Sequence, residues 1–217
     1  MKAIVLTGYS SGLGRAIHNN LVKVETNSRL FFIGRGLDQL KESKNRVYIQ
    51  LDLSNLSDIN SFEFDAYLKD IDELIFISNA GTIIPISPIL DIKVEKLYES
   101  VNVNFLAPVL LISKFKKYVD KIKIINISSG AATKPVPYWS LYCANKSAIK
   151  MFLDTVSLEK EISVEHFDPG MVDTNMQAII REKSKTYNEL DFFMEASDNG
   201  KLQDPYNVAT EICRMIL

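Results

Sequence analysis

Short apolar runs recur along the chain, and each ends at a polar residue or a glycine. The runs lack the strict alternation of apolar and polar residues that marks a strand with one face in water. Short runs without that alternation are typical of strands buried on both faces, as in a parallel sheet. We predict six such strands: Ala3–Leu6, Leu30–Ile33, Val47–Leu51, Leu74–Ile77, Ile122–Ile127 and Ser163–Phe167.

Longer segments with helical spacing separate these runs. Their apolar residues recur every three or four positions, which places them on one face of a helix. A strand followed by a helix, repeated along the chain, predicts an α/β fold, a Rossmann-type doubly wound parallel sheet flanked by helices. The predicted apolar faces are Leu13, Ile17 and Leu21; Ile59, Phe62, Ala66 and Leu68; Leu97, Val101, Phe105 and Val109; and Ile149, Phe152, Val156 and Leu158.

Composition narrows the class of protein without indicating a function. The 217 residues are 47% hydrophobic and 24% charged, which predicts one globular domain over residues 1–217. The net charge of −2 offers no basic field for nucleic acid. Two cysteines, Cys143 and Cys213, and two histidines, His18 and His166, are too few for a disulfide framework or a Cys/His metal site. No apolar run approaches the ~20 residues of a membrane span, so we expect a cytoplasmic protein.

Eight of the nine glycines follow a predicted strand closely. The carboxyl ends of parallel strands share one edge of the sheet, and ligands of open α/β sheets bind at that edge. Glycines that only made turns would occur at both edges, whereas the opposite edge has at most Gly200. The glycines therefore predict a ligand cleft.

The first strand runs into Thr7-Gly8-Tyr9-Ser10-Ser11-Gly12-Leu13-Gly14. A glycine-rich turn between a strand and a helix lets the backbone approach a pyrophosphate, and the first N–H groups of the helix attract the anion. We predict that this loop binds a dinucleotide. The expected contacts are Gly8, Ser10, Ser11, Gly12, Leu13 and Gly14.

The end of the second strand favours NADP(H) over NAD(H). An acidic residue there would repel a 2′-phosphate, but the sequence reads Gly34-Arg35-Gly36, and the guanidinium of Arg35 can pair with a phosphate. Arg15 either assists or is a surface residue. Asp52, which Leu53 follows, either binds the adenine or caps the next helix. Ser54 or Ser57 could also supply that helix cap.

Tyr142 and Lys146 open a helical segment and lie one turn apart on one face. An ammonium beside a phenol lowers the phenol's pKa, which makes tyrosine usable as a general acid or base. The strand before this segment ends in Ser128-Ser129-Gly130, and its serines can donate to a carbonyl oxygen. Cys143, between Tyr142 and Lys146, is predicted to be a buried helix thiol, and both histidines are predicted to be structural.

Six motifs follow one another along nearly the whole chain: TGYSSGLG at 7–14, NAG at 79–81, NVNF at 102–105, INISS at 125–129, YCANK at 142–146 and PGMVDT at 169–174. In order and spacing they resemble the short-chain dehydrogenase/reductase family. The family commonly has a further asparagine where this chain has Ser78, a departure expected to affect a structural hydrogen bond rather than the chemistry.

The resemblance implies the following roles. Tyr142 is the general acid/base, Lys146 lowers its pKa and binds the nicotinamide ribose, Ser129 polarises the carbonyl group, and Asn104 holds a water in the proton relay. Asn79, Ala80 and Gly81 line the adenosine side of the cofactor. The nicotinamide is embraced by Pro169, Gly170, Val172 and Thr174, with Thr174 or Val172 meeting its carboxamide.

Two further stretches, Trp139–Cys143 and Phe167–Gln177, are similar to the benzil reductase and sepiapterin reductase branch, which reduces vicinal dicarbonyls. The predicted pocket residues are Trp139, Met171 and Met176, whereas Phe192 and Phe193 are expected to pack in the core. Residues 175–204 are expected to cover the substrate as a lid.

The resemblance thus predicts an NADPH-dependent carbonyl reductase, a possible homodimer. One alternative is an NAD-linked alcohol dehydrogenase. A non-catalytic dinucleotide sensor is less favoured, because Tyr142 and Lys146 are both present. The family's usual seventh strand has no counterpart after the helix that begins at Pro205, so we expect a six-stranded sheet with a bare edge.

Overall fold

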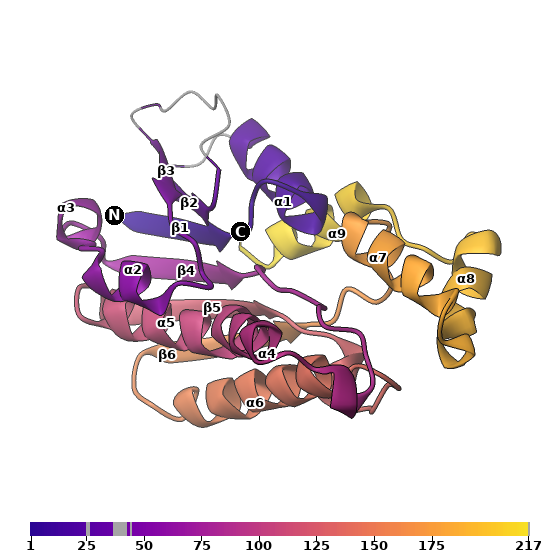
Figure 1. Ribbon diagram of the computed structural model, residues 1–217. Coiled ribbons are helices and arrows are strands. Elements are labelled where there is room, and N and C mark those ends of the chain that lie inside the picture. Colours follow the sequence, from indigo (N-terminus) through magenta and orange to yellow (C-terminus); the bar gives the residue numbers. More distant parts are fainter. Residues whose placement is uncertain (25–26, 37–42, 44, 217) are drawn as a thin grey trace.

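A computed structural model describes residues 1–24, 27–36, 43 and 45–216. Within these residues six parallel strands form one sheet in the order β3-β2-β1-β4-β5-β6 (Figure 1). The predicted Rossmann-type sheet is confirmed, and the strand order reverses between β1 and β4, where ligands of such sheets bind. The strands are β1 (Lys2–Thr7), β2 (Arg29–Gly34), β3 (Arg46–Gln50), β4 (Glu73–Ser78), β5 (Lys121–Ile127) and β6 (Ile162–Phe167).

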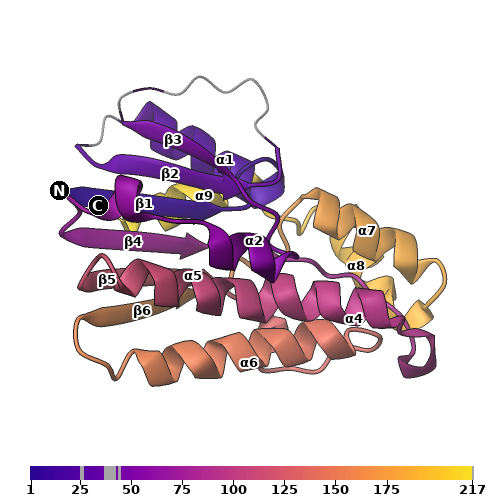
Figure 2. The ribbon, with the colours of Figure 1, turned by 60° about the vertical axis from the view of Figure 1, so that its left-hand side comes forward.

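Helices cover both faces of the sheet (Figures 1 and 2). On one face, α1 (Gly12–Lys23) and α9 (Pro205–Arg214) pack with Ile4 and Leu6 of β1 in one apolar cluster. On the other face, α5 (Ala107–Lys116) and α6 (Ser140–Val156) pack with Ala3 and Val5 in a second cluster. Because successive side chains of a strand point to opposite faces, burial of both faces explains the continuous apolar runs.

The predicted helix over Ile59–Leu68 is wrong in its continuity, because two short helices occupy this stretch. They are α2 (Leu56–Ser61) and α3 (Asp65–Leu68). The backbone becomes extended at Phe62, and Phe64 then enters the core, where its ring lies 5.1 Å from that of Phe115. Burial of this phenylalanine outweighs continuation of the helix.

The predicted helix over Leu97–Val109 is one helical run with a π-helical turn inside it. It consists of α4 (Val94–Val101), η2 (Asn102–Leu106) and α5. Such turns occur frequently at functional sites, and this one contains Asn104. The predicted helix ending at Leu158 stops earlier, at Val156, and Leu158 is exposed.

The residues after β6 leave the sheet and form a helical extension beside it (Figure 1). This extension contains α7 (Asn175–Ser184), η4 (Asn188–Leu190) and α8 (Asp191–Asp198), and the chain then returns to α9. Two other short helices, η1 (Ile89–Asp91) and η3 (Gly130–Ala132), complete the assignment for the described residues. None of the helices in the described ranges has both the length and the apolar character needed to cross a bilayer.

Candidate active site

The phosphate loop lies between β1 and α1, as predicted. A Cβ on Gly14 would lie 1.9 Å from the carbonyl oxygen of Gly8, so only glycine allows this close turn. Ser10 and Ser11 are exposed, and Ser11 makes no side-chain capping bond to the first turn of α1. Ser11 therefore does not occupy the first N–H groups of α1, which fits a helix N-terminus that binds a dinucleotide pyrophosphate.

Asn79 joins the phosphate loop to the end of β4. Its side chain donates to the carbonyl oxygens of Thr7 and Gly8 at 3.0 and 3.3 Å. In turn, the Thr7 hydroxyl accepts from the backbone N–H groups of Asn79 and Ala80 at 3.1 and 3.2 Å. These four bonds hold the edges of β1 and β4 together at the point where the strand order reverses.

At the adenosine end, β2 finishes beside Tyr9 of the phosphate loop. Tyr9 is buried, its hydroxyl donates to the carbonyl oxygen of Gly36, and a Cβ on Gly34 would lie 3.0 Å from its ring. Arg35 is exposed, and its carbonyl oxygen accepts from Gln50 at 3.0 Å. This arrangement presents the guanidinium of Arg35 to solvent at the end of the cleft.

The third strand offers less than predicted. Asp52 does not cap α2, nor does Ser54 or Ser57: the cap is Asn55, whose side chain accepts from the N–H groups of Ser57 and Asp58. One oxygen of Asp52 accepts from the N–H and hydroxyl of Ser54 at 2.9 and 2.8 Å, which leaves its second oxygen for a ligand.

The side chains of Leu13 and Leu53, two predicted cofactor contacts, are buried in the core. Leu53 is buried in the core on the α5 and α6 face of the sheet, and Leu13 is buried in the core on the α1 and α9 face. A cofactor contact at either position therefore falls to a peptide group rather than to the side chain.

The catalytic candidates come together as predicted where β5 ends and α6 begins. Tyr142 and Lys146 are both buried, and the ammonium of Lys146 lies 5.7 Å from the centroid of the Tyr142 ring. Lys146 donates to the carbonyl oxygen of Ile127 at 2.8 Å. Of the two serines, Ser129 interacts with the Tyr142 hydroxyl, whereas Ser128 is buried.

Burial dominates the electrostatics of this pair. It raises the pKa of Tyr142 to about 12, against a lowering contribution from its hydrogen bond with Ser129. Burial also lowers the pKa of Lys146 to about 8. The expected net lowering of the pKa of Tyr142 is thus wrong for this structure, because loss of water around the phenol outweighs its hydrogen bond with Ser129.

Asn104 lies in the π-helical turn and is buried. Its side chain donates to the carbonyl oxygen of Thr82 at 2.9 Å and accepts from the N–H of Thr82 at 2.9 Å. Ser100 accepts from both Asn104 and Asn145 of α6, at 3.3 and 3.1 Å. The Asn104 side chain is therefore committed to fixing the Thr82 backbone and the start of α6, and its role in a proton relay stays a prediction.

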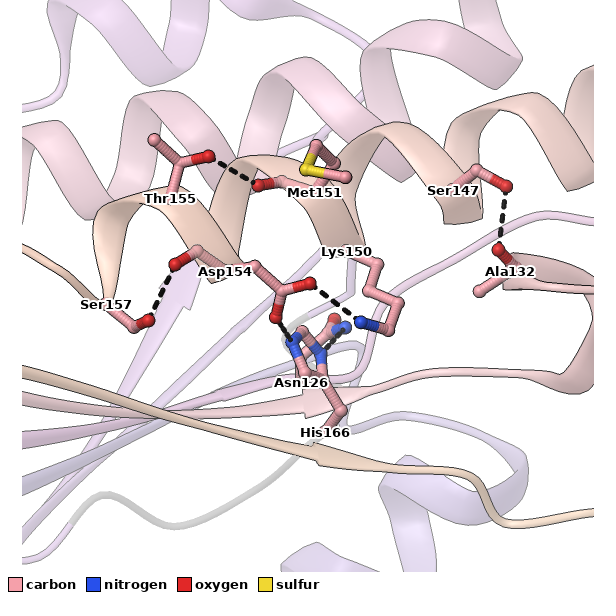
Figure 3. Close-up of polar contacts among 9 residues, drawn as sticks. All are labelled: Asn126, Ala132, Ser147, Lys150, Met151, Asp154, Thr155, Ser157 and His166. Carbon is pink, nitrogen blue, oxygen red and sulfur yellow. Dashed lines mark hydrogen bonds and ion pairs between the residues drawn. The ribbon is translucent and has the colours of Figure 1, made fainter.

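A second polar cluster anchors α6 farther along (Figure 3). His166 of β6 lies 3.0 Å from Asn126 of β5 and 2.9 Å from Asp154 of α6, and Asp154 also accepts from Lys150 at 2.7 Å. The Lys150 ammonium and then His166 hold the pKa of the Asp154 carboxyl below its usual value. The geometry agrees with a structural His166, which ties the helix carrying Tyr142 to the sheet.

The predicted nicotinamide segment follows β6. Val172 is buried in the core formed with α1 and α9. Thr174, by contrast, is half-buried, and a Cβ on Gly12 would lie 3.3 Å from its Cβ and Cγ2 atoms. Of the two candidates for meeting the carboxamide, Thr174 therefore has the accessible side chain.

The pocket residues form a third apolar cluster around Tyr142. The Trp139 ring lies edge-on to Tyr142 at 5.7 Å and stacks on Phe193 of α8 at 5.0 Å. Phe193 is buried as expected, but Phe192 is 47% exposed, so the expectation of core packing is wrong there. Successive residues of a helix point about 100° apart, so Phe193 faces the cluster and Phe192 does not. Met171 and Met176 pack against this cluster.

The family model described as short chain dehydrogenase matches residues 2–185. The chain belongs to this family. Among its relatives is a benzil reductase ((S)-benzoin forming) from Bacillus cereus, 36% identical over 237 residues, which cover 100% of this chain and 94% of that protein. A sepiapterin reductase from Xenopus tropicalis is 26% identical, over 92% of this chain and 85% of that protein. The crystal structure of the KRED1-Pglu enzyme matches with a TM-score of 0.84 and 27% sequence identity. The match covers 96% of this chain and 92% of that one.

Membership of the short-chain dehydrogenase family makes this chain an oxidoreductase that interconverts carbonyl and hydroxyl groups with NAD(P). The likeness to benzil and sepiapterin reductases agrees with the branch predicted from the sequence. The glycine turn and the uncapped first turn of α1 fit the dinucleotide.

Sequence reasoning missed three residues around this site. Asp168 is an exposed carboxylate whose charge raises the pKa values of both Tyr142 and Lys146. Its place directly before Pro169-Gly170 at a strand end was the signal available. Ser100 and Gln203 carried no signal, because their partners are distant along the chain.

Proposed function

We propose that this short-chain dehydrogenase reduces one carbonyl group of a vicinal dicarbonyl compound with NADPH, and that Tyr142 donates the proton. The observation that carries the proposal is the cluster of buried Tyr142 and Lys146 with half-buried Ser129 at the carboxyl end of β5. A phenol and an ammonium that are removed from water thus lie beside a hydroxyl group that stays partly accessible.

A bound nicotinamide dinucleotide supplies the hydride. Ser129 donates a hydrogen bond to the substrate carbonyl oxygen and stabilises the negative charge that develops on it. Tyr142, whose pKa is about 12, is fully protonated at neutral pH and transfers its proton to that oxygen. Lys146 in its charged form then stabilises the phenolate that remains.

Two features support a preference for NADPH. The end of β2 carries no carboxylate that would repel a 2′-phosphate, and Arg35 is exposed beside it. Replacing Arg35 by alanine should lower the NADPH to NADH preference by about tenfold or more, since it removes a charged hydrogen-bond donor. Arg214→Ala, an exposed arginine of α9, is the matched control. Unchanged preference in Arg35→Ala would assign selectivity elsewhere, and a wild type that favours NADH would support an NAD-linked enzyme.

The dicarbonyl substrate is supported by the pocket and by the relatives. The ring of Trp139 lies 5.7 Å from that of Tyr142, and its buried Nε1 has no hydrogen-bond partner among the described residues. Buried polar atoms are normally paired, so an unpaired donor beside Tyr142 suits a ligand with a second oxygen. The relatives named benzil reductase and sepiapterin reductase point the same way. Residues 175–204 are proposed to cover this substrate, because Phe193 stacks on Trp139.

The decisive experiment replaces Tyr142 by phenylalanine. We expect kcat for benzil reduction with NADPH to fall by about 10²–10⁴, the usual contribution of a positioned acid, while the Kd for NADPH stays the same. Tyr206→Phe is the control, since this α9 tyrosine is 51% exposed. Full activity of Tyr142→Phe would refute its proposed role. Comparing benzil with deoxybenzoin, which has one carbonyl, tests the substrate class.

We also propose a homodimer. The exposed residues of α6 are uncharged, and the Lys150–Asp154 ion pair lies beside them: they are Ser140, Ala144, Ser147, Ala148, Met151 and Thr155. On α4, Val94 and Tyr98 are exposed apolar side chains. Exposed apolar side chains that gather on one face mark association surfaces. Sedimentation should show a dimer that Met151→Lys dissociates, and a monomeric wild type would refute the proposal.

A further inference from the structure

Gln203 joins the two ends of the helical extension, where the chain returns from α8. Its N–H donates to the carbonyl oxygen of Met171 at 2.8 Å, and its carbonyl oxygen accepts from the N–H of Asp173 at 2.9 Å. These bonds form a parallel bridge between Gln203 and Val172. Residues on either side of α7 and α8 are therefore held together at the base of the extension.

The side chain of Gln203 makes a separate contact. Its Nε2 donates to the carbonyl oxygen of Pro169 at 2.7 Å, across 34 positions of sequence. Gly170 has a φ of +65°, and a Cβ there would lie 2.8 Å from the same nitrogen. The amide of Gln203 thus lies directly against the peptide of a glycine that has no side chain to displace it.

The segment that Gln203 holds continues to the phosphate loop. Thr174 packs against Gly12, where a Cβ would lie 3.3 Å from the threonine Cβ and Cγ2 atoms. A displacement of Pro169 therefore changes how Thr174 meets the loop, and with it the width of the cleft at this end.

This contact contributes little to the stability of the fold. Gln203 is exposed, and it lies outside the apolar clusters of the described residues. A single hydrogen bond of this kind stabilises a protein by about 0.5–1.5 kcal/mol. A strong effect of its removal on one ligand would therefore report on local placement rather than on folding.

We propose that Gln203 is a positioning residue that sets the place of residues 169–174 against the nicotinamide half of the cofactor. This inference rests on the proposed function in one respect, that the nicotinamide lies at this segment. Methionine at position 203 would keep the length of the side chain but could not donate to Pro169. Glutamate would place a second acceptor against the Pro169 oxygen and would push the segment away.

The test compares two ligands by calorimetry on the full chain. NADP⁺ reaches both ends of the cleft, whereas 2′,5′-ADP carries the adenosine and its 2′-phosphate without the nicotinamide. For Gln203→Met we expect the Kd for NADP⁺ to rise about threefold to tenfold and the Kd for 2′,5′-ADP to stay unchanged. Gln203→Glu should weaken NADP⁺ further. Asn207→Ala, an exposed amide on α9, should change neither Kd.

Each other outcome has a definite meaning. Equal weakening of both ligands, or no change in either, would overturn the proposal. A fall in Tm of more than about 6 °C, beyond what one lost hydrogen bond explains, would indicate a merely structural role. If wild type binds NAD⁺ rather than NADP⁺, the proposed preference for NADPH is refuted. The role of Gln203 is then tested by the same comparison with NAD⁺ and 5′-AMP. If wild type binds no dinucleotide, the proposed function fails, and this proposal fails with it.

Discussion

The phosphate loop and the segment at residues 169–174 lie against each other across the cleft, but they are held in different ways. The loop is held by backbone groups and by Asn79, which bonds to the carbonyl oxygens of Thr7 and Gly8. The opposite segment is held by Gln203, whose exposed amide bonds to Pro169. The comparison teaches that close backbone packing holds one side, while the other side combines the buried side chain of Val172 with a few exposed hydrogen bonds.

The largest expected effect is that of Gly14→Ala. A Cβ at this position would lie 1.9 Å from the backbone oxygen of Gly8, and neither atom belongs to a flexible side chain. We expect a loss of several kcal/mol of unfolding free energy and no measurable binding of NADP⁺. Denaturant unfolding and calorimetry check this. Gly200→Ala is the control: with nothing within 4 Å and a φ of +65°, it should cost only about 1–2 kcal/mol.

The next effect is a pH dependence of stability at Lys146. Its pKa is about 8 in the folded protein, below the ordinary value of 10.5, so the unfolded chain holds the proton more tightly. The free energy of unfolding should therefore rise with pH between about 8 and 10.5. Proton linkage limits the slope to about 1.4 kcal/mol per pH unit.

Unfolding measured at pH 7.5, 8.5 and 9.5 should show this rise in wild type and not in Lys146→Met. Above pH 10 the raised pKa of Tyr142 acts in the opposite direction, because the folded state then keeps a proton that the unfolded chain has lost. A difference between the two proteins that does not change with pH would contradict the lowered pKa of Lys146.

Gly170→Ala should cost less than Gly14→Ala. The new Cβ would meet the end of a flexible side chain, Gln203 Nε2 at 2.8 Å, and the φ of +65° adds strain of about 1–2 kcal/mol. Adding Gln203→Ala should recover the part of the loss that is due to crowding. If Gly170→Ala destabilises the protein as much as Gly14→Ala, the contrast between the two sides of the cleft is wrong.

The smallest effect concerns Gln50, the adenosine-end counterpart of Gln203. Its side chain donates to the carbonyl oxygen of Arg35 at 3.0 Å. Gln50→Met should raise the Kd values of NADP⁺ and 2′,5′-ADP alike, by about twofold to tenfold, because both ligands contain the 2′-phosphate. If Gln50→Met weakened the binding of NADP⁺ but not of 2′,5′-ADP, Gln50 would not act at the adenosine half of the cofactor.

Much of the site could be predicted because its signals are local. The order of strands and helices follows from periodicity, and the phosphate loop follows from three glycines within eight residues, Thr7 to Gly14. Tyr142 and Lys146 are one helical turn apart, so their spacing alone places them on one face. In each case the residues that must meet are neighbours in the sequence.

The wrong predictions concern burial. A lowered pKa was expected for Tyr142 because of its charged neighbour, but the apolar cluster of Trp139 and Phe193 around it reverses the direction. Phe192 and Phe193 look alike in the sequence, yet only Phe193 faces that cluster. The break between α2 and α3 likewise follows from the place that Phe64 finds beside Phe115.

The amino-acid sequence by itself determined the α/β fold, the glycine turn, the absence of a carboxylate at the end of β2 and the identities of the catalytic candidates. The tertiary structure alone decided the directions of the pKa shifts of Tyr142 and Lys146, the burial of the Val172 side chain, and the contact of Gln203 with Pro169. The physical reason is that propensity and periodicity act between neighbours in the chain. Desolvation and hydrogen bonding between distant segments depend on which surfaces the folded chain brings together.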